Sequence, residues 1–257
     1  MNRLAALRDL YMRESKHSNY QRLPRRLGEL LGQQTVKTCS RYEDERLAFI
    51  TANIDLGGKT ALDVGANTGF FAFEALDHGA RRVAIYEGNA AHAEFLRCAA
   101  EVLGVADRVC VTDAYLDFPT PTLPERYDIG LLMNVLHHVG DDFGETSLDV
   151  AGARSLIGES LRSLARQCSL LVFQIGYCWK GDRLLPLFGN GTKAEQIDFV
   201  SAAVLGHWRI ETIGIPVRTS RGVVYSAPDA ENMQRRDDLG EFLNRPLFLL
   251  RSLTADT

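Results

Sequence analysis

The sequence predicts an α/β protein with a seven-stranded, mostly parallel sheet that follows an N-terminal helical extension. From about Lys59 onward, short runs of β-forming residues alternate with longer runs of helical periodicity, which is typical of parallel strands joined by crossover helices. Before Lys59, apolar residues recur at helical spacing instead. The chain has 257 residues, 46% of them hydrophobic, so it can bury a large core within one domain.

The extension is expected to form two amphipathic helices that are interrupted near Pro24. Their apolar positions are Leu4, Leu7 and Tyr11, and then Leu23, Leu27, Leu30 and Leu31. We therefore predict a helical extension over residues 1–50 and an α/β domain over residues 51–257. The first thirty residues are also basic, with the cations Arg3, Arg8, Arg13, Lys16, Arg22, Arg25 and Arg26 against Asp9, Glu14 and Glu29. This pattern fits either a solvated helical face or a surface that binds anions.

Seven segments have the composition of strands. They are Thr60–Gly65, Arg82–Glu87, Arg108–Thr112, Tyr127–Met133, Ser169–Ile175, Trp208–Ile213 and Pro246–Arg251. Helices are expected from Gly69 to Gly79, from Asn89 to Leu103, along the apolar face from Val150 to Leu164, and from Thr192 to Gly206. The polar, turn-rich stretch 216–244 is interpreted as an insertion between the last two strands.

The most informative motif joins the first strand to the first helix of the α/β region. It reads Leu-Asp-Val-Gly-Ala-Asn-Thr-Gly-Phe-Phe from Leu62 to Phe71, so an apolar strand runs into a turn with two glycines. Gly65 and Gly69 permit a sharp turn and a close approach of a ligand to the backbone. The spacing G-x-x-x-G lacks the middle glycine of the dinucleotide fingerprint, which argues against a pyrophosphate ligand.

This turn and the Asp63 before it resemble the first motif of class I S-adenosylmethionine-dependent methyltransferases. The resemblance covers roughly Ala61 to Ile175 and, more loosely, the last strand. It implies a Rossmann-like sheet with an antiparallel last strand, helices on both faces, and S-adenosylmethionine as cofactor. It also implies that the turn lies beside the methionyl part of the cofactor, with Asp63 orienting the ammonium group.

Acidic residues end the next two strands, where ligands gather in open α/β sheets. Glu87 suits two hydrogen bonds from ribose hydroxyls, and the resemblance implies that Asp113 accepts one from the adenine amino group. Each carboxylate is also compatible with an ordinary strand-end residue. The complete set expected to contact the cofactor is Asp63, Gly65, Ala66, Asn67, Gly69, Phe70, Glu87, Gly88, Asp113, Ala114, Asn134 and Val135.

The fourth strand continues into Asn134-Val135-Leu136-His137-His138-Val139, a sequence similar to one in many small-molecule and glycan methyltransferases. A histidine suits the removal of a proton from a hydroxyl acceptor, because its ordinary pKa lies near neutrality. His138 is the first candidate for this base and His137 the second. Either histidine is also compatible with packing against the cofactor or capping a loop.

Aromatic and cationic residues follow the fifth strand and are candidates for binding the acceptor. These are Tyr177, Trp179, Lys180 and Arg183, which suit a ring or sugar face together with an anionic group. The alternative is that Trp179 packs under its loop while the cations are solvated. Arg41 and Arg46, upstream of the first strand, could reach the carboxylate of the cofactor, but both are assigned to an ordinary surface helix.

The sequence therefore predicts an S-adenosylmethionine-dependent methyltransferase, acting on the oxygen of a hydroxylated small molecule, sugar or glycan. Alternatives are modification of tRNA at a wobble uridine, a catalytically silent scaffold, and a nicotinamide-dependent oxidoreductase. The net charge of −4 argues mildly against nonspecific nucleic-acid binding. No apolar run reaches the roughly 18 residues of a membrane span, and we expect a cytoplasmic protein. The five scattered cysteines show no metal-ligand spacing, so no metal is expected.

Overall fold

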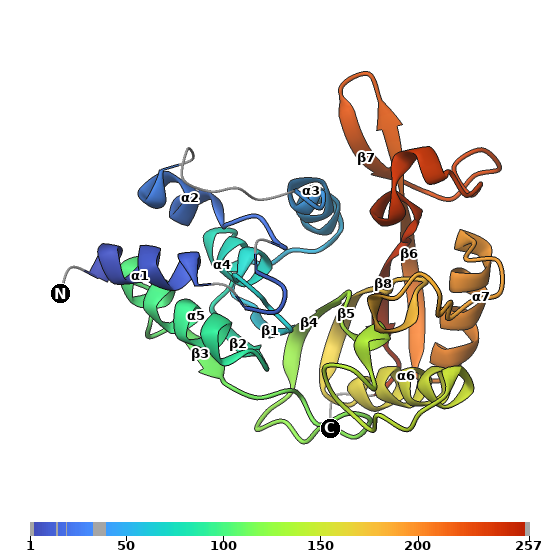
Figure 1. Cartoon of the computed structure of the whole chain (residues 1–257), viewed down its shortest axis with the longest axis horizontal. Coiled ribbons are helices and arrows are strands. Elements are labelled where there is room, and N and C mark those ends of the chain that lie inside the picture. Colours follow the sequence, from blue (N-terminus) through green and yellow to red (C-terminus); the bar gives the residue numbers. More distant parts are fainter. Residues whose placement is uncertain (1–2, 14, 19, 33–39, 255–257) are drawn as a thin grey trace. The chain divides into compact units, whose positions relative to one another are not determined.

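The computed structural model describes residues 3–13, 15–18, 20–32 and 40–254, and these form two compact units (Figure 1). Unit 1 comprises Met1–Leu47 and Thr51–Leu116. Unit 2 comprises Ala48–Ile50 and Asp117–Thr257. The candidate cofactor residues up to Ala114 belong to unit 1, whereas both histidines and the candidate acceptor residues belong to unit 2.

Unit 1 contains three parallel strands in the order β3-β2-β1, with Asp63 opposite Ile85 and Tyr86 opposite Thr112. The strands are β1 (Thr60–Val64), β2 (Arg82–Tyr86) and β3 (Val109–Thr112), and the helices are α1 (Arg3–Met12), α2 (Arg25–Leu31), α4 (Phe70–Asp77) and α5 (Ala90–Val102). The helix α3 (Glu43–Asn53) belongs to unit 1 except for Ala48–Ile50. All five residues of β1 are buried, as its apolar composition predicts for a strand within a sheet. The helix α5 begins where the Asn89 side chain accepts the Ala91 N–H at 3.0 Å.

Unit 2 combines parallel and antiparallel pairing. The strand β4 (Tyr127–Met133) lies parallel to β5 (Cys168–Gln174), whereas β8 (Leu247–Ser252) runs antiparallel to both β5 and β6 (Trp208–Thr219). The strand β7 (Gly222–Ser226) then forms a hairpin with β6. The helices α6 (Val150–Leu164) and α7 (Lys193–Val204) are capped by Asp149 and by a capping box of Thr192 and Glu195.

The seven predicted strands are confirmed to within a few residues, apart from β6, and the last strand is antiparallel as expected. The predicted number of strands was wrong, because the described residues contain eight. The sheet pairing is mixed instead of mostly parallel, with three parallel and three antiparallel pairs among those described. The additional strand β7 and the end of β6 lie in the stretch 216–244 that had been interpreted as an insertion. Pro216 and the polar turn suggested a loop, but Val217 pairs with Val224 in a hairpin.

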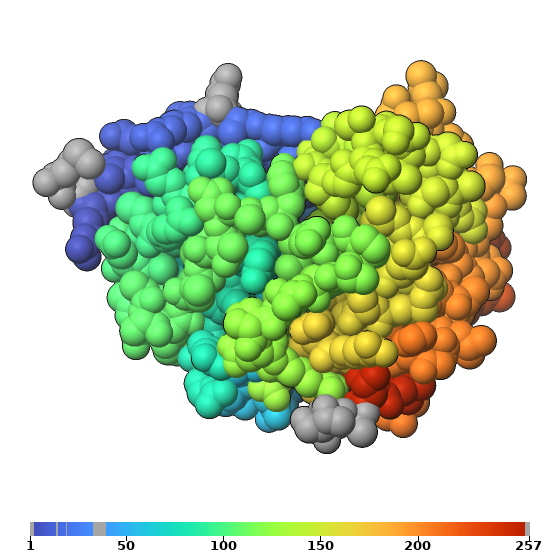
Figure 2. All heavy atoms as spheres, turned by 90° about the horizontal axis from the view of Figure 1, so that it is seen from below, coloured from blue at the N-terminus to red at the C-terminus, as the bar shows by residue number. Residues whose placement is uncertain are grey.

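The two helices predicted in the N-terminal extension are present, and α2 begins directly after Pro24. Figure 1 shows α1 beside α5, and the dark blue atoms of this segment also adjoin the rest of unit 1 in the space-filling view of Figure 2. Arg46 was wrongly assigned to a surface position. It is 4% exposed, and its guanidinium lies 4.9 Å from the centre of the Phe71 ring. Among the described residues, no helix has the length and apolar composition needed to cross a membrane.

Candidate functional site

The turn after β1 has an unusual backbone that the sequence explains. Gly65, Asn67 and Gly69 have positive φ values of 70°, 54° and 79°, and the Gly65 N–H donates to the Tyr86 carbonyl at 2.8 Å. A Cβ on Gly69 would lie 2.6 Å from a methyl carbon of Leu96, so this residue must be glycine for packing as well as for conformation. The turn is therefore rigidly attached to β2 and α5.

Asp63, the acidic residue of β1, has a buried carboxyl group with one unsatisfied oxygen. It is 4% exposed, and its Oδ2 has no hydrogen-bond partner among the described residues. Burial, reinforced by the negative charge of Glu87, raises the pKa of Asp63 to about 7. Because a buried acceptor without a donor is costly, this oxygen is suited to a ligand that carries an N–H or ammonium donor.

Glu87 lies beside the same turn and is 7% exposed. One carboxylate oxygen accepts the Asn67 N–H at 2.7 Å, and the other accepts the Asn89 N–H at 2.9 Å. The structure thus brings Asp63, Asn67 and Glu87 together in unit 1. Gly88 follows, and a Cβ there would lie 2.3 Å from the Tyr115 ring, so the ring packs directly on this backbone.

The other candidate cofactor residues of unit 1 divide between buried and exposed positions. Ala66 and Phe70 are buried in the turn and at the start of α4. Asp113 and Ala114, after β3, are exposed, and a carboxylate oxygen of Asp113 lies 3.9 Å from a guanidinium nitrogen of Arg97. The position of Asp113 at the end of its strand is as predicted, and its contact with adenine stays a prediction.

The N-terminal segment contacts the turn after β1, a feature that the sequence analysis missed. The Gln21 side-chain oxygen accepts the Phe70 N–H at 3.2 Å, and the His17 carbonyl accepts a side-chain N–H of Asn67 at 3.1 Å. Nearby, His92 is 7% exposed, and burial and the charge of His17 lower its pKa to about 4. Helical periodicity carries no information about these contacts, because they come from the irregular chain between α1 and α2.

In unit 2, Asn134 belongs to a closed ring of hydrogen bonds at the end of β4. Its side-chain N–H donates to Gln174 at 3.1 Å, Gln174 donates to the Arg245 carbonyl at 3.1 Å, and Arg245 donates to the Asn134 side-chain oxygen at 2.6 Å. Asn134 has φ 62°, and Arg245 is 4% exposed and pairs with Glu241. Sequence reasoning missed Gln174 and Arg245, because their partners are distant in the chain. The half-buried Val135 follows Asn134.

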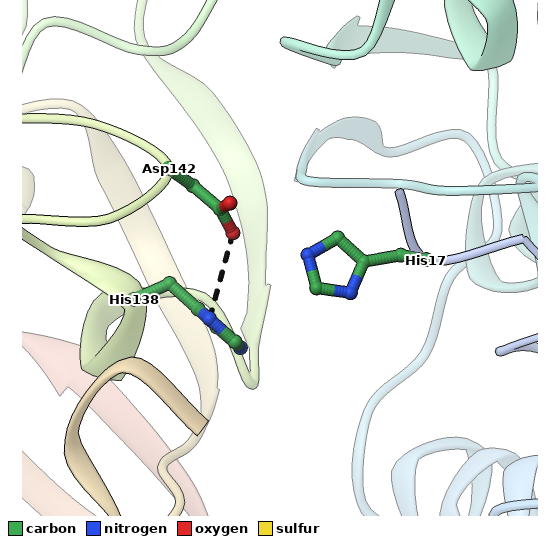
Figure 3. Close-up of side chains that lie close together, drawn as sticks. All are labelled: His17, His138 and Asp142. Carbon is green, nitrogen blue, oxygen red and sulfur yellow. Dashed lines mark ion pairs between the residues drawn. The ribbon is translucent and has the colours of Figure 1, made fainter. Parts of the chain in front are cut away.

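The two candidate bases follow in a 3₁₀ turn, Leu136–His138 (η2), with ring centroids 4.3 Å apart. His137 is 2% exposed, and its Nδ1 accepts the Gly176 N–H at 3.4 Å. The Nδ1 of His138 lies 3.5 Å from a carboxylate oxygen of Asp142, as Figure 3 shows. Asp142 was not among the predicted residues, although its spacing of four from His138 was visible in the sequence.

The candidate acceptor residues occupy the loop after β5. Trp179 is 5% exposed, and its indole N–H donates to the Val139 carbonyl at 2.6 Å. The Lys180 ammonium lies 4.3 Å from the centre of the Trp179 ring, and Lys180 has φ 57°. The Arg235 guanidinium carbon lies 4.4 Å from the centre of the Tyr177 ring, and burial raises the pKa of the Tyr177 phenol. Arg183 lies on the exposed part of the loop.

No protein-family model matches the chain, and no curated protein matches it in sequence. Solved structures do resemble it. The magnesium protoporphyrin IX methyltransferase of Synechocystis PCC 6803, solved with bound S-adenosylmethionine, has a TM-score of 0.52 and 14% identity over 98% of this chain and 97% of its own. An S-adenosylmethionine-dependent methyltransferase from Mesorhizobium loti has a TM-score of 0.50 and 18% identity over 80% of this chain and 97% of its own.

The [4+2]-cyclase SpnF is similar as well, with a TM-score of 0.53 and 15% identity over 82% of each chain. At these identities the likeness shows the fold alone. The chain therefore shares its α/β fold with these two S-adenosylmethionine-dependent enzymes and with the cyclase. Because a cyclase is among the similar structures, the reaction has to be argued from the residues of the site.

Proposed function

We propose that this protein is an S-adenosylmethionine-dependent methyltransferase that acts on a hydroxyl oxygen. The unsatisfied, buried Oδ2 of Asp63 carries this proposal. S-adenosylmethionine has an ammonium group that satisfies such an oxygen, and its lack of a phosphate agrees with the absent middle glycine of the turn. When bound, the cofactor supplies an activated methyl group on a sulfonium.

Within unit 1, Glu87 is the residue proposed to hold the ribose hydroxyls. Its carboxylate is fixed by the Asn67 and Asn89 N–H groups, so its position is set before any ligand arrives. A carboxylate oxygen can accept more than one hydrogen bond, so an ionised Glu87 is chemically suited to hydroxyl donors. Asp113 is proposed to accept a hydrogen bond from the adenine amino group. The residues proposed to contact the cofactor through their backbone are Gly65, Ala66, Asn67, Gly69, Phe70 and Gly88.

Within unit 2, His138 is proposed as the base and the loop after β5 as the surface that binds the acceptor. The half-buried Tyr177 offers a ring edge, whereas the buried Trp179 supports the loop from below and holds Lys180 beside its ring. No carboxylate among the described residues forms an ion pair with Lys180 or Arg183. A cation held beside an aromatic ring suits an anionic group on the acceptor. The proposed acceptor is thus a hydroxylated small molecule, sugar or glycan that carries an anionic group. Asn134 and Val135 are proposed to contact the cofactor.

Modification of tRNA is the alternative that would use the basic N-terminal segment. Four of its cations already pair with carboxylates in unit 1, in the pairs Arg3–Glu101, Arg13–Glu94, Arg22–Asp44 and Arg26–Asp77. This pairing lowers the positive charge available to a phosphate backbone and favours a structural role for the segment. A silent scaffold is disfavoured, because it has no physical need for the unsatisfied Asp63 oxygen.

Calorimetric titration with S-adenosylhomocysteine tests the proposal, with NAD as a control ligand and Glu87→Gln as the matched variant. We expect micromolar binding to the wild type, at least tenfold weaker binding to the variant, and no binding of NAD. A folded protein that binds NAD, or neither ligand, would contradict the proposal. Transfer of radiolabelled methyl groups to hydroxylated sugars, sugar phosphates and tRNA then separates the acceptor classes.

A further inference from the structure

His138 and Asp142 are brought together by the backbone of the loop that follows β4. The N–H groups of Asp141 and Asp142 both donate to the His138 carbonyl at 3.0 Å, so the chain turns back over this residue. The Asp142 carboxylate then lies 3.5 Å from the His138 Nδ1 (Figure 3). Their side chains are only 15% and 12% exposed, so water screens this pair less than it would a surface ion pair.

Packing on two further sides fixes the orientation of the His138 ring. The His137 ring is tilted by 42° against it, with the centroids 4.3 Å apart. On another side, the backbone at Gly181 lies near the ring, since a Cβ added there would be in van der Waals contact with the His138 Cε1 at 3.4 Å. The ring is thus held with its Nδ1 edge toward Asp142.

The neighbouring His137 has the opposite hydrogen-bonding pattern. A backbone N–H can only donate, so the Gly176 N–H at 3.4 Å requires a lone pair on the His137 Nδ1. In neutral His137 the proton must therefore reside on Nε2. His137 is also 2% exposed, which leaves little access for an acceptor molecule.

We infer that Asp142 is a positioning residue that selects the tautomer of His138 and thereby makes it, and not His137, the base of the proposed methyl transfer. An ionised carboxylate facing Nδ1 favours the tautomer with the proton on Nδ1, whose lone pair is on Nε2. This inference rests on the proposed function for its chemical meaning. The tautomer assignment itself does not depend on the acceptor.

In the proposed reaction, a proton moves from the acceptor to His138 and the methyl group moves from sulfur to the acceptor oxygen. The acceptor O–H bond breaks as an N–H bond forms at the His138 Nε2, and the oxygen uses the released electron pair to bond the methyl carbon. The carbon–sulfur bond of the donor, S-adenosylmethionine, breaks, and its electron pair stays on the sulfur. The imidazolium of His138 is stabilised by the Asp142 carboxylate and then releases the proton to water.

Proton–nitrogen correlation spectra of the full-length, ligand-free protein at pH 8 test the tautomers directly. We expect His138 with its proton on Nδ1 and His137 with its proton on Nε2. In Asp142→Asn, the ratio of the Nε2-protonated to the Nδ1-protonated tautomer of His138 should rise at least threefold. Asp142→Glu should restore the original tautomer, and Asp141→Asn, which removes the same charge at the next residue, should leave it unchanged.

Two results would overturn the inference: a wild-type His138 protonated on Nε2, or identical tautomer populations in Asp142→Asn and Asp141→Asn. Should Asp142→Asn fail to fold, Asp142→Glu and the wild-type spectrum still decide the question. Titration with S-adenosylhomocysteine on the same samples separates the two proposals. A folded wild type that does not bind S-adenosylhomocysteine would contradict the proposed function. An Nε2-protonated His138 in a wild type that does bind it would contradict only the role of Asp142.

Discussion

Asp63 is a buried carboxyl group whose protonation should be coupled to binding of the proposed cofactor. Its pKa of about 7 means that it is mostly neutral at pH 6 and mostly ionised at pH 8. The main cause is burial, and the neighbouring Glu87 charge acts in the same direction. An ammonium group bound at this carboxyl would favour its ionised form and lower its pKa.

We therefore predict that binding of S-adenosylhomocysteine at pH 6 releases about one proton per site from Asp63, and that binding at pH 8.5 releases close to none. Calorimetry in buffers of different ionisation enthalpy measures this release. Asp63→Asn cannot release the proton and should bind more weakly at both pH values. Equal proton release by Asp63→Asn and the wild type would assign the proton to another group.

Asn67 offers a second test at the scale of one residue, because its backbone conformation and its side-chain bonds can be separated. It has φ 54°, its side chain donates to the His17 carbonyl, and its oxygen accepts the Thr68 N–H at 2.9 Å. Asn67→Gly loses the bonds but tolerates the conformation, whereas Asn67→Ala loses the bonds and is also strained. We expect Asn67→Ala to be less stable than Asn67→Gly by about 1 kcal/mol in urea unfolding. The opposite order would show that the turn relaxes in the variants.

At the scale of elements, two buried indole hydrogen bonds join segments that are distant in the chain. The Trp179 indole joins the loop after β5 to Val139 at 2.6 Å, and the Trp208 indole joins β6 to the end of α6, at Leu161, at 2.7 Å. The two bonds have the same chemistry and similar burial, with Trp179 at 5% and Trp208 at 3% exposed. They form a matched pair for separating stability from local order.

Trp179→Phe and Trp208→Phe should each lower the free energy of unfolding by about 1–3 kcal/mol, since each leaves a buried carbonyl without its donor. Only Trp179→Phe should accelerate amide hydrogen exchange in residues 136–142 and 179–185. Hydrogen exchange followed by mass spectrometry measures both. Equal acceleration of exchange in these segments by Trp208→Phe would mean that the effect is global.

At the scale of the whole molecule, the proposed cofactor carboxylates and the proposed base lie in different compact units of the chain. Substitutions should therefore have separable effects on binding and on chemistry. Excess S-adenosylhomocysteine should raise the melting temperature of His138→Gln as much as that of the wild type, and it should raise that of Glu87→Gln much less. Thermal unfolding at a fixed ligand concentration measures the shifts. Equal shifts in both variants would argue that Glu87 does not contact the ligand.

Much of the fold was predictable from the sequence because its signals are local. Apolar periodicity located the strands and helices, and Asn89 and Thr192, where two helices were predicted to begin, form capping bonds within three residues. The glycines and Asp63 of the turn were predictable for the same reason, since the conformation of the turn depends on its own residues. The strand β7 was missed because its pairing with β6 outweighs the turn-forming composition of that stretch.

The tertiary structure alone decided the features that depend on distant partners. The pKa of Asp63 depends on its burial and on Glu87, and the conformation of Asn134 is stabilised by Gln174 and by Arg245, 111 residues away. The sequence by itself determined the α/β elements and a short set of candidate residues. Only the folded chain distinguished His137 from His138, because the burial of His137 and its contact with Gly176 arise from packing between segments that no local pattern encodes.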